Sequence, residues 1–266
     1  MAGVWILAGL TLVIALVGGL LPVLGKWKEN QKLLHKSTSI AAGVLLASAL
    51  LVILPEGFSL AGDSNHLLIG GMVLSGFMMM LILEGSGIGH AIHEEHHDHE
   101  GEHGHAHVHH QTAPLLLVLG LSLHAAADGL AIGSAMASGN TAISTIITLA
   151  VILHKMPAAF SLGVFSTHQN DEKKNVIRDV ALFSLATPLF IVLSFFMLQN
   201  ITHETIGLLL LFAGGTFLYV STVDTLPDIH NAETGKAAML HVVLGAGLLA
   251  LALLIADYSG VVELGH

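Results

Sequence analysis

Eight long apolar stretches constrain the fold of this 266-residue chain more than any other feature. A helix that crosses the hydrocarbon of a bilayer needs about 20 predominantly apolar residues. Runs such as LLVIL and LLLLFAGG are apolar on every side, whereas the strands of a membrane barrel alternate with a period of two. The sequence therefore predicts an all-α polytopic membrane protein with eight transmembrane helices. The stretches lie near residues 3–24, 38–60, 66–87, 115–138, 142–167, 177–198, 205–226 and 237–256.

The composition agrees with a surface that faces lipid. Hydrophobic residues make up 53% of the chain and charged residues only 11%, a balance that would cover a soluble protein poorly. We expect one transmembrane domain over residues 1–266, with the lipid bilayer and not nucleic acid as its surroundings. The first stretch lacks a basic leader and is long for a signal peptide, so we expect it to be a retained span. The chain has no cysteine, which excludes thiolate ligands.

The nine basic residues predict the topology. Eight follow odd-numbered spans, and the ninth, Lys155, lies inside the fifth span. Because basic residues favour cytoplasmic loops, we expect both termini to be extracytoplasmic. The membrane itself stays open between a plasma or bacterial inner membrane and, in a eukaryote, the Golgi. The eight residues are Lys26, Lys28, Lys32, Lys36, Lys173, Lys174, Arg178 and Lys236.

Spans two and seven share two short sequence motifs at the same separation. The triplet AAG at 41–43 precedes LPE at 54–56 by the same spacing at which AGG at 213–215 precedes LPD at 226–228. The two spans run in opposite directions in the predicted topology. Spans one to three and six to eight would then be inverted repeats that flank a central pair, spans four and five, as in many transporters with a midplane site. The alternative is chance similarity between glycine-rich apolar helices.

Four ionisable residues lie near the middle of spans four and five. His124 and Asp128 are four residues apart on one helix face, and His154 and Lys155 lie at a matching depth. A charge at that depth costs about 3 kcal/mol, so these residues are expected to face the bundle interior. Two imidazoles and a carboxylate suit zinc, and also Fe(II), Mn(II), Co(II) or Cd(II). The alternative is a hydrogen-bonded pair that only joins the helices, and Lys155 would either pair with Asp128 or fill the place of a second cation.

Three motifs resemble the ZIP (Zrt-, Irt-like) family of divalent metal transporters. HAAADG at 124–129 is similar to the fourth-helix signature HN-x-x-D/E-G, and HKMPAAF at 154–160 to the fifth-helix signature HE-x-P-H-E. GTFLYVSTVDTLPD at 215–228 is similar to the seventh helix of the family. Eight spans and a His-rich loop between helices three and four are also typical of it. The resemblance implies a homodimer in which a rigid transport unit slides against the flanking repeats. We expect zinc to move toward the cytoplasm by alternating access, along its own gradient and the membrane potential, without an organic cofactor.

The departures from the family pattern concern a second metal ion. The resemblance keeps the two histidines and Asp128 as ligands of a first site. At the second site, Ala125 replaces the usual Asn, Lys155 the usual acidic residue and Ala158 the usual His or Glu. These changes imply one transported ion, with the Lys155 ammonium as a substitute for the charge of the second metal. They match a branch that resembles the ninth human ZIP.

A His-rich segment, residues 88–113, forms the loop between spans three and four. Its composition predicts a disordered cytoplasmic loop, which could bind metal leaving the pore or act only as a solvated tether. The histidines that could bind metal are His93, His96, His97, His99, His103, His105, His107, His109 and His110.

Three carboxylates near span ends are candidate pathway residues. Glu56 lies at the outer end of span two, and Asp224 and Asp228 lie near the inner end of span seven. They could attract cations, although helix-end carboxylates are often merely solvated.

Two other functions fit the ligand set of His124, Asp128 and His154, an intramembrane metal-dependent hydrolase and a metal-sensing receptor. Because no separate general base is apparent, we expect a transporter and not an enzyme.

Overall fold

The computed structural model is helical wherever it describes regular structure. It describes residues 2–24, 31–86, 114–170, 172–223 and 235–259. Eight helical segments in these ranges are long and apolar enough to cross a membrane, which confirms the predicted all-α polytopic fold. The elements are α1 (Ala2–Leu24), α2 (Gln31–Ser48), η2 (Ala49–Ile53), α3 (Leu54–Ala61), α4 (His66–Gly85), α5 (Pro114–Ala137), α6 (Thr141–Gln169), α7 (Lys173–Leu198), α8 (His203–Val223) and α10 (Gly235–Tyr258).

The second span is not one regular helix, because α2, the π-helical turn η2 and α3 follow one another without a break. Pro55 has no N–H, so the carbonyl of Leu51 loses its usual α-helical partner. The chain responds just before this point with a wider turn, in which the Leu54 N–H donates to the carbonyl of Ala49. The sixth span also differs in its start, since α7 begins at Lys173 and not near residue 177.

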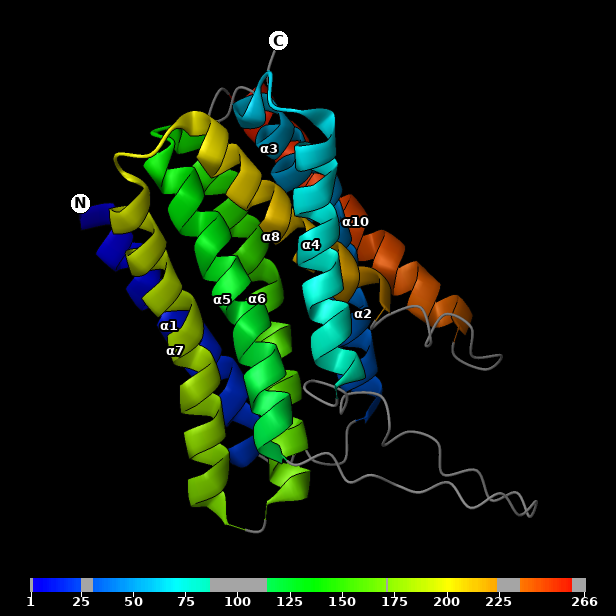
Figure 1. The fold of residues 1–266 in the computed structure, drawn as a ribbon. Helices are drawn as coiled ribbons and strands as arrows, with labels where there is room; N and C mark the ends of the chain where they lie inside the picture. Colours follow the sequence, from blue (N-terminus) through cyan, green and yellow to red (C-terminus); the bar gives the residue numbers. More distant parts are fainter. Residues whose placement is uncertain (1, 25–30, 87–113, 171, 224–234, 260–266) are drawn as a thin grey trace.

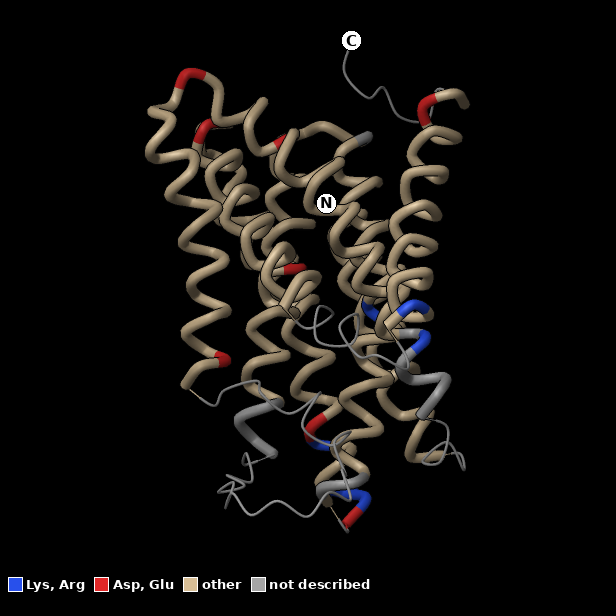
Figure 2. The backbone as a smooth tube through the Cα atoms, turned by 90° about the vertical axis from the view of Figure 1, so that its right-hand side faces the viewer, with Lys and Arg blue, Asp and Glu red and all other residues tan. Residues whose placement is uncertain are grey.

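The helices form two bundles (Figure 1). We call α1, α5, α6 and α7 the ligand bundle, because the candidate ligands His124, Asp128 and His154 lie on α5 and α6, and we call α2, η2, α3, α4, α8 and α10 the second bundle. The two bundles meet where α5 contacts α8 and where α6 contacts α2. The first helix begins and the last helix ends at the same end of the molecule, which we call the N/C end. The described Lys and Arg residues, blue in Figure 2, all lie away from the N/C end.

The helix contacts repeat in the way that an inverted repeat requires. α2 packs against α10 as α8 packs against α4, and α1 packs against α6 as α7 packs against α5. Exchanging spans one to three with six to eight, and span four with span five, converts each pair into the other. The matched glycines behave alike, since a Cβ on Gly43 would lie 2.0 Å from the Val242 carbonyl oxygen and one on Gly215 would lie 2.0 Å from that of Val73. These close approaches support the repeat predicted from the sequence.

The largest apolar cluster joins the two bundles. It contains residues of α2, η2, α8 and α10 from the second bundle, together with residues of all four helices of the ligand bundle. We call it the shared core; its residues on α5 and α6 lie in the halves of these helices nearer the N/C end. A smaller cluster, which includes Phe165 and Phe183, belongs to the ligand bundle alone. The described apolar clusters that hold the bundles together are thus concentrated on one side of the molecule's middle.

Candidate metal site

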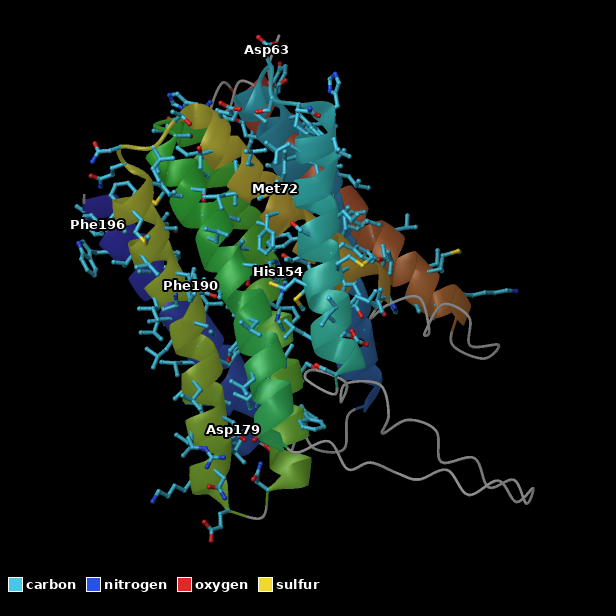
Figure 3. The ribbon with its side chains drawn as sticks, in the orientation of Figure 1. Asp63, Met72, His154, Asp179, Phe190 and Phe196 are labelled. Atoms are coloured by element: carbon cyan, nitrogen blue, oxygen red, sulfur yellow. The ribbon has the colours of Figure 1, made fainter. Side chains whose placement is uncertain are left out.

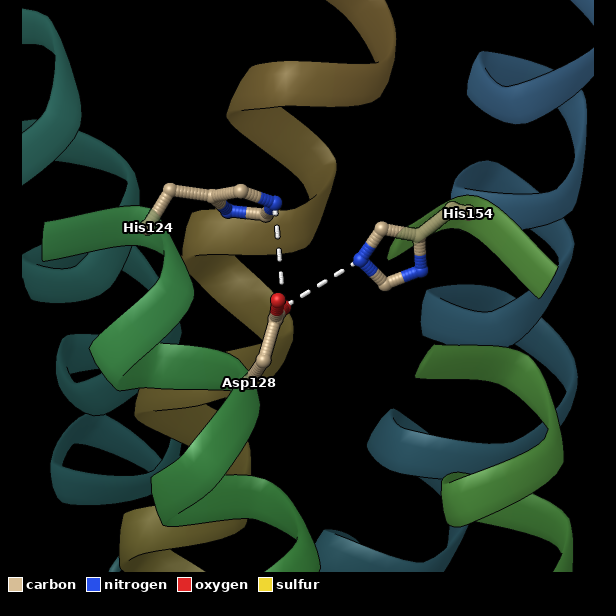
Figure 4. A group of neighbouring side chains, drawn as sticks. All are labelled: His124, Asp128 and His154. Carbon is tan, nitrogen blue, oxygen red and sulfur yellow. Dashed lines mark ion pairs between the residues drawn. The ribbon is translucent and has the colours of Figure 1, made fainter. Parts of the chain in front are cut away.

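The three predicted ligands come together between α5 and α6. His124 and Asp128 lie one turn apart on α5, and His154 faces them from α6 (Figure 4). Asp128 Oδ1 is 3.7 Å from His124 Nε2 and 3.3 Å from His154 Nε2. One ligand atom from each residue lies within 4.8 Å of the other two, and all three side chains are buried. Ligands about 2.1 Å from a tetrahedral zinc ion lie about 3.4 Å from one another, so the spacing suits a small divalent cation.

The ligand atoms have unused lone pairs. Asp128 Oδ1, His154 Nε2 and both ring nitrogens of His124 are buried without a hydrogen-bond partner. His154 Nδ1 lies 2.9 Å from the Ala150 carbonyl, which can only accept, so this nitrogen donates, and in the neutral ring Nε2 presents a lone pair. A carboxylate oxygen and a lone pair then face each other at 3.3 Å. A cation between them would satisfy both atoms, whereas a purely structural pair would be joined by a hydrogen bond.

Lys155 occupies the other side of the Asp128 carboxylate. Its Nζ donates to Asp128 Oδ2 at 3.1 Å and to Thr187 Oγ1 at 2.5 Å, and it lies 4.5 Å from the centre of the Phe183 ring. Thr187 in turn donates to the carbonyl of Ala125, at 2.7 Å. The ion pair with Asp128, one of the two roles considered for Lys155, is present. The carboxylate therefore has one oxygen for the ion site and one for the ammonium.

Sequence reasoning missed three residues of this site. Thr187 and Phe183 lie on α7, where a single threonine or phenylalanine within an apolar span gives no signal of function. Phe217 lies on α8 of the second bundle, with its ring centre 5.8 Å from that of His124 and 5.6 Å from that of His154. The only sequence signal for Phe217 was its place in the seventh-helix motif. That these residues belong to the site can be recognised only from the packing of the helices.

The remaining candidates lie outside this cluster. Glu56 is half-buried in the first turn of α3 and does not join the three ligands. Asp224, Asp228 and all the loop histidines named above fall outside the described residues. Within the described ranges, His124, Asp128 and His154 form the one group of three or more such side chains that could hold a metal ion.

Comparisons with known proteins agree with this architecture. The family model described as ZIP Zinc transporter matches residues 2–111 and 85–253. The chain is 30% identical to Zinc transporter ZIP9 of Micropogonias undulatus, over 84% of this chain and 83% of that protein. It is also 30% identical to Zinc transporter ZIP9-B of Xenopus laevis, over 83% of this chain and 85% of that protein. Human Zinc transporter ZIP4 is 32% identical over 51% of this chain and 21% of its own length. The chain belongs to the ZIP family of zinc transporters, in a branch that resembles ZIP9.

Proposed function

We propose that this chain moves zinc through a single ion site, formed by His124, Asp128 and His154, that opens alternately to the two sides of the membrane. Family membership indicates a membrane transporter of divalent metal and not an enzyme, so the hydrolase alternative falls away. One observation carries the detailed proposal. Three ligand atoms with unused lone pairs lie within 4.8 Å of one another, buried where the two bundles meet.

The position of the ligands supports a site near the membrane midplane. His124 and Asp128 lie near the middle of the 24-residue helix α5, and His154 lies near the middle of the 29-residue helix α6. Figure 3 shows His154 between Asp63 at one end and Asp179, which lies toward the other end. All the ligands belong to one bundle, while the second bundle covers them. A displacement of the ligand bundle against the second bundle would therefore change the side to which the ion is open.

Lys155 supports the proposal of one ion per chain. Its ammonium contacts the Asp128 oxygen that a second ion would need, and Thr187 and Phe183 complete its surroundings. Two unit charges 4 Å apart repel by about 4 kcal/mol at an effective dielectric constant of 20, and a divalent ion doubles that repulsion. Zinc at the first site leaves no favourable place for a second cation. Iron, manganese, cobalt and cadmium remain chemically compatible with the first site.

The membrane potential supports a direction of transport. We propose inward movement, toward the cytoplasm, because a divalent cation gains about 4.6 kcal/mol per 100 mV of membrane potential. The cycle as proposed needs no organic cofactor. We also propose a homodimer in a plasma, inner or Golgi membrane, from the family resemblance alone.

Zinc flux into proteoliposomes tests the function. We expect saturable zinc entry, read by an internal zinc dye, that falls about 100-fold or more in His124→Ala and in His154→Ala, since even the partners of metal ligands matter by 10–100-fold. His241→Ala is the matched control, because His241 lies in a membrane-spanning helix outside the ligand cluster. Saturable binding without flux in the unmodified protein would favour a metal-sensing receptor instead.

Metal stoichiometry tests the role of Lys155. We expect the purified unmodified protein to bind one zinc ion and Lys155→Glu to bind two, because the substitution replaces a cation with a ligand beside Asp128. Lys155→Met removes the charge without adding a ligand and should still bind one. Metal analysis by mass spectrometry after removal of free zinc gives the count. One ion in Lys155→Glu, with unchanged preference among metals, would show that Lys155 does not stand in for a second ion.

A further inference from the structure

Phe217, on α8 of the second bundle, packs its ring against both candidate histidine ligands. Its ring is fully buried, lies edge-on to His154 at 80°, and is tilted by 57° to His124. The two histidine rings are themselves 5.7 Å apart, so the three rings form a nearly equilateral triangle. Phe217 thus packs on the imidazoles themselves.

Phe217 also belongs to the shared core, which continues from the ion site toward the N/C end. Ala131, one turn beyond Asp128 on α5, and Val151, one turn before His154 on α6, are both completely buried in this core. The apolar cluster on the other side of the site lies within the ligand bundle and does not bridge to the second bundle. Inter-bundle apolar packing therefore borders the site on the N/C side, and Phe217 is the member of that packing whose ring lies against both histidines.

We infer that Phe217 is an occluding residue, which closes the ion site toward the N/C end when the two bundles are in the arrangement seen here. The inference rests on the proposed function, because only a transported ion requires that this contact be broken and remade. An ion that enters from the N/C end must pass between the bundles, so the contacts of Phe217 with His124 and His154 must separate first. Removing the ring leaves a cavity beside the imidazoles, through which water and small solutes reach the site without movement of the bundles.

Because the chain has no cysteine, a single introduced thiol can be labelled specifically to test this inference. A single Ala131→Cys substitution places one thiol in the shared core, a turn from Asp128, in an otherwise cysteine-free chain. A membrane-impermeant methanethiosulfonate reagent, applied to the N/C side of sealed vesicles without zinc, reports how often this position is open. We expect the labelling rate to rise about tenfold or more when Phe217→Ala is added, because the ring removed is a fully buried one.

The control separates occlusion from general loosening. Leu211 lies on the same helix and is equally buried, but it packs in a cluster within the second bundle. Leu211→Ala should leave the labelling of the introduced thiol within about twofold of its starting rate, although it removes a similar apolar side chain. Phe217→Leu, which keeps an apolar chain but loses the ring, serves where the alanine variant does not fold, and it should raise labelling by a smaller factor.

Two results would overturn the inference. The first is a labelling rate that Phe217→Ala and Phe217→Leu leave unchanged, and the second is an equal increase with Leu211→Ala. Labelling is measured without zinc, so a labelling result that contradicts the inference can be told apart from an absence of zinc transport. Loss of the proposed function would appear as absent flux in the unmodified protein, whatever the accessibility of the introduced thiol.

Discussion

Asp128→Asn is expected to abolish zinc flux and to destabilise the protein by about 3–5 kcal/mol, the cost of removing one partner from a buried ion pair. The carboxylate has two separate tasks. Oδ1 faces both histidines at the ion site, and Oδ2 accepts from Lys155 at 3.1 Å. An amide can neither balance a buried ammonium nor serve as an anionic ligand. Thermal unfolding in detergent and proteoliposome flux should therefore both change in this single variant.

A second substitution separates these two tasks. Lys155→Met in the Asp128→Asn background removes the unpaired charge and leaves an apolar chain beside Phe183 and Thr187. We expect most of the lost stability to return, because replacing both members of a buried pair is often neutral. Zinc flux should stay absent, because the ligand is still missing. An Asp128→Asn variant as stable as the parent, or a double variant that transports zinc, would contradict this division of roles.

The spans and the clustering of the three candidate ligands could be predicted because each depends on local sequence. An apolar run of about 20 residues identifies a crossing helix without knowledge of its neighbours. The cost of placing His124, Asp128 and His154 in such runs predicts that they face one another, and the structure brings them together. The pairing of Lys155 with Asp128 followed from the same argument, because an ammonium at that depth needs a counter-ion.

The rest of the site could not be predicted because it depends on how separate spans pack. Thr187 contacts Lys155 only because α7 crosses α5 closely, where a Cβ on Gly129 would lie 2.4 Å from the Thr187 carbonyl oxygen. Phe217 reaches the histidines only because α8 of the second bundle lies against α5. The apolar residues of one helix do not show which of its faces meets another helix and which meets lipid. The division into two bundles, on which the proposed movement depends, was hidden for the same reason.

Gly43→Ala and Gly215→Ala are expected to destabilise the protein by about 3 kcal/mol each, the upper part of the usual cost of overpacking. A methyl at either position would lie 2.0 Å from a backbone carbonyl oxygen, of Val242 or of Val73, which no change of side-chain rotamer relieves. The helices would have to separate, and α2 against α10 and α8 against α4 would lose their close packing. The shift in the thermal unfolding midpoint in detergent measures this cost.

Gly70→Ala is the matched control, because an added Cβ there has no atom within 4 Å. It should be neutral or stabilise α4 by up to about 1 kcal/mol, since alanine favours a helix more than glycine does. Equal sensitivity at Gly43 and Gly215 is what the inverted repeat requires, because the two residues hold equivalent positions in spans two and seven. If the alanine substitution lowers the unfolding midpoint at only one of the two glycines, the α2–α10 and α8–α4 contacts are not equivalent. The sequence echo would then be chance similarity after all.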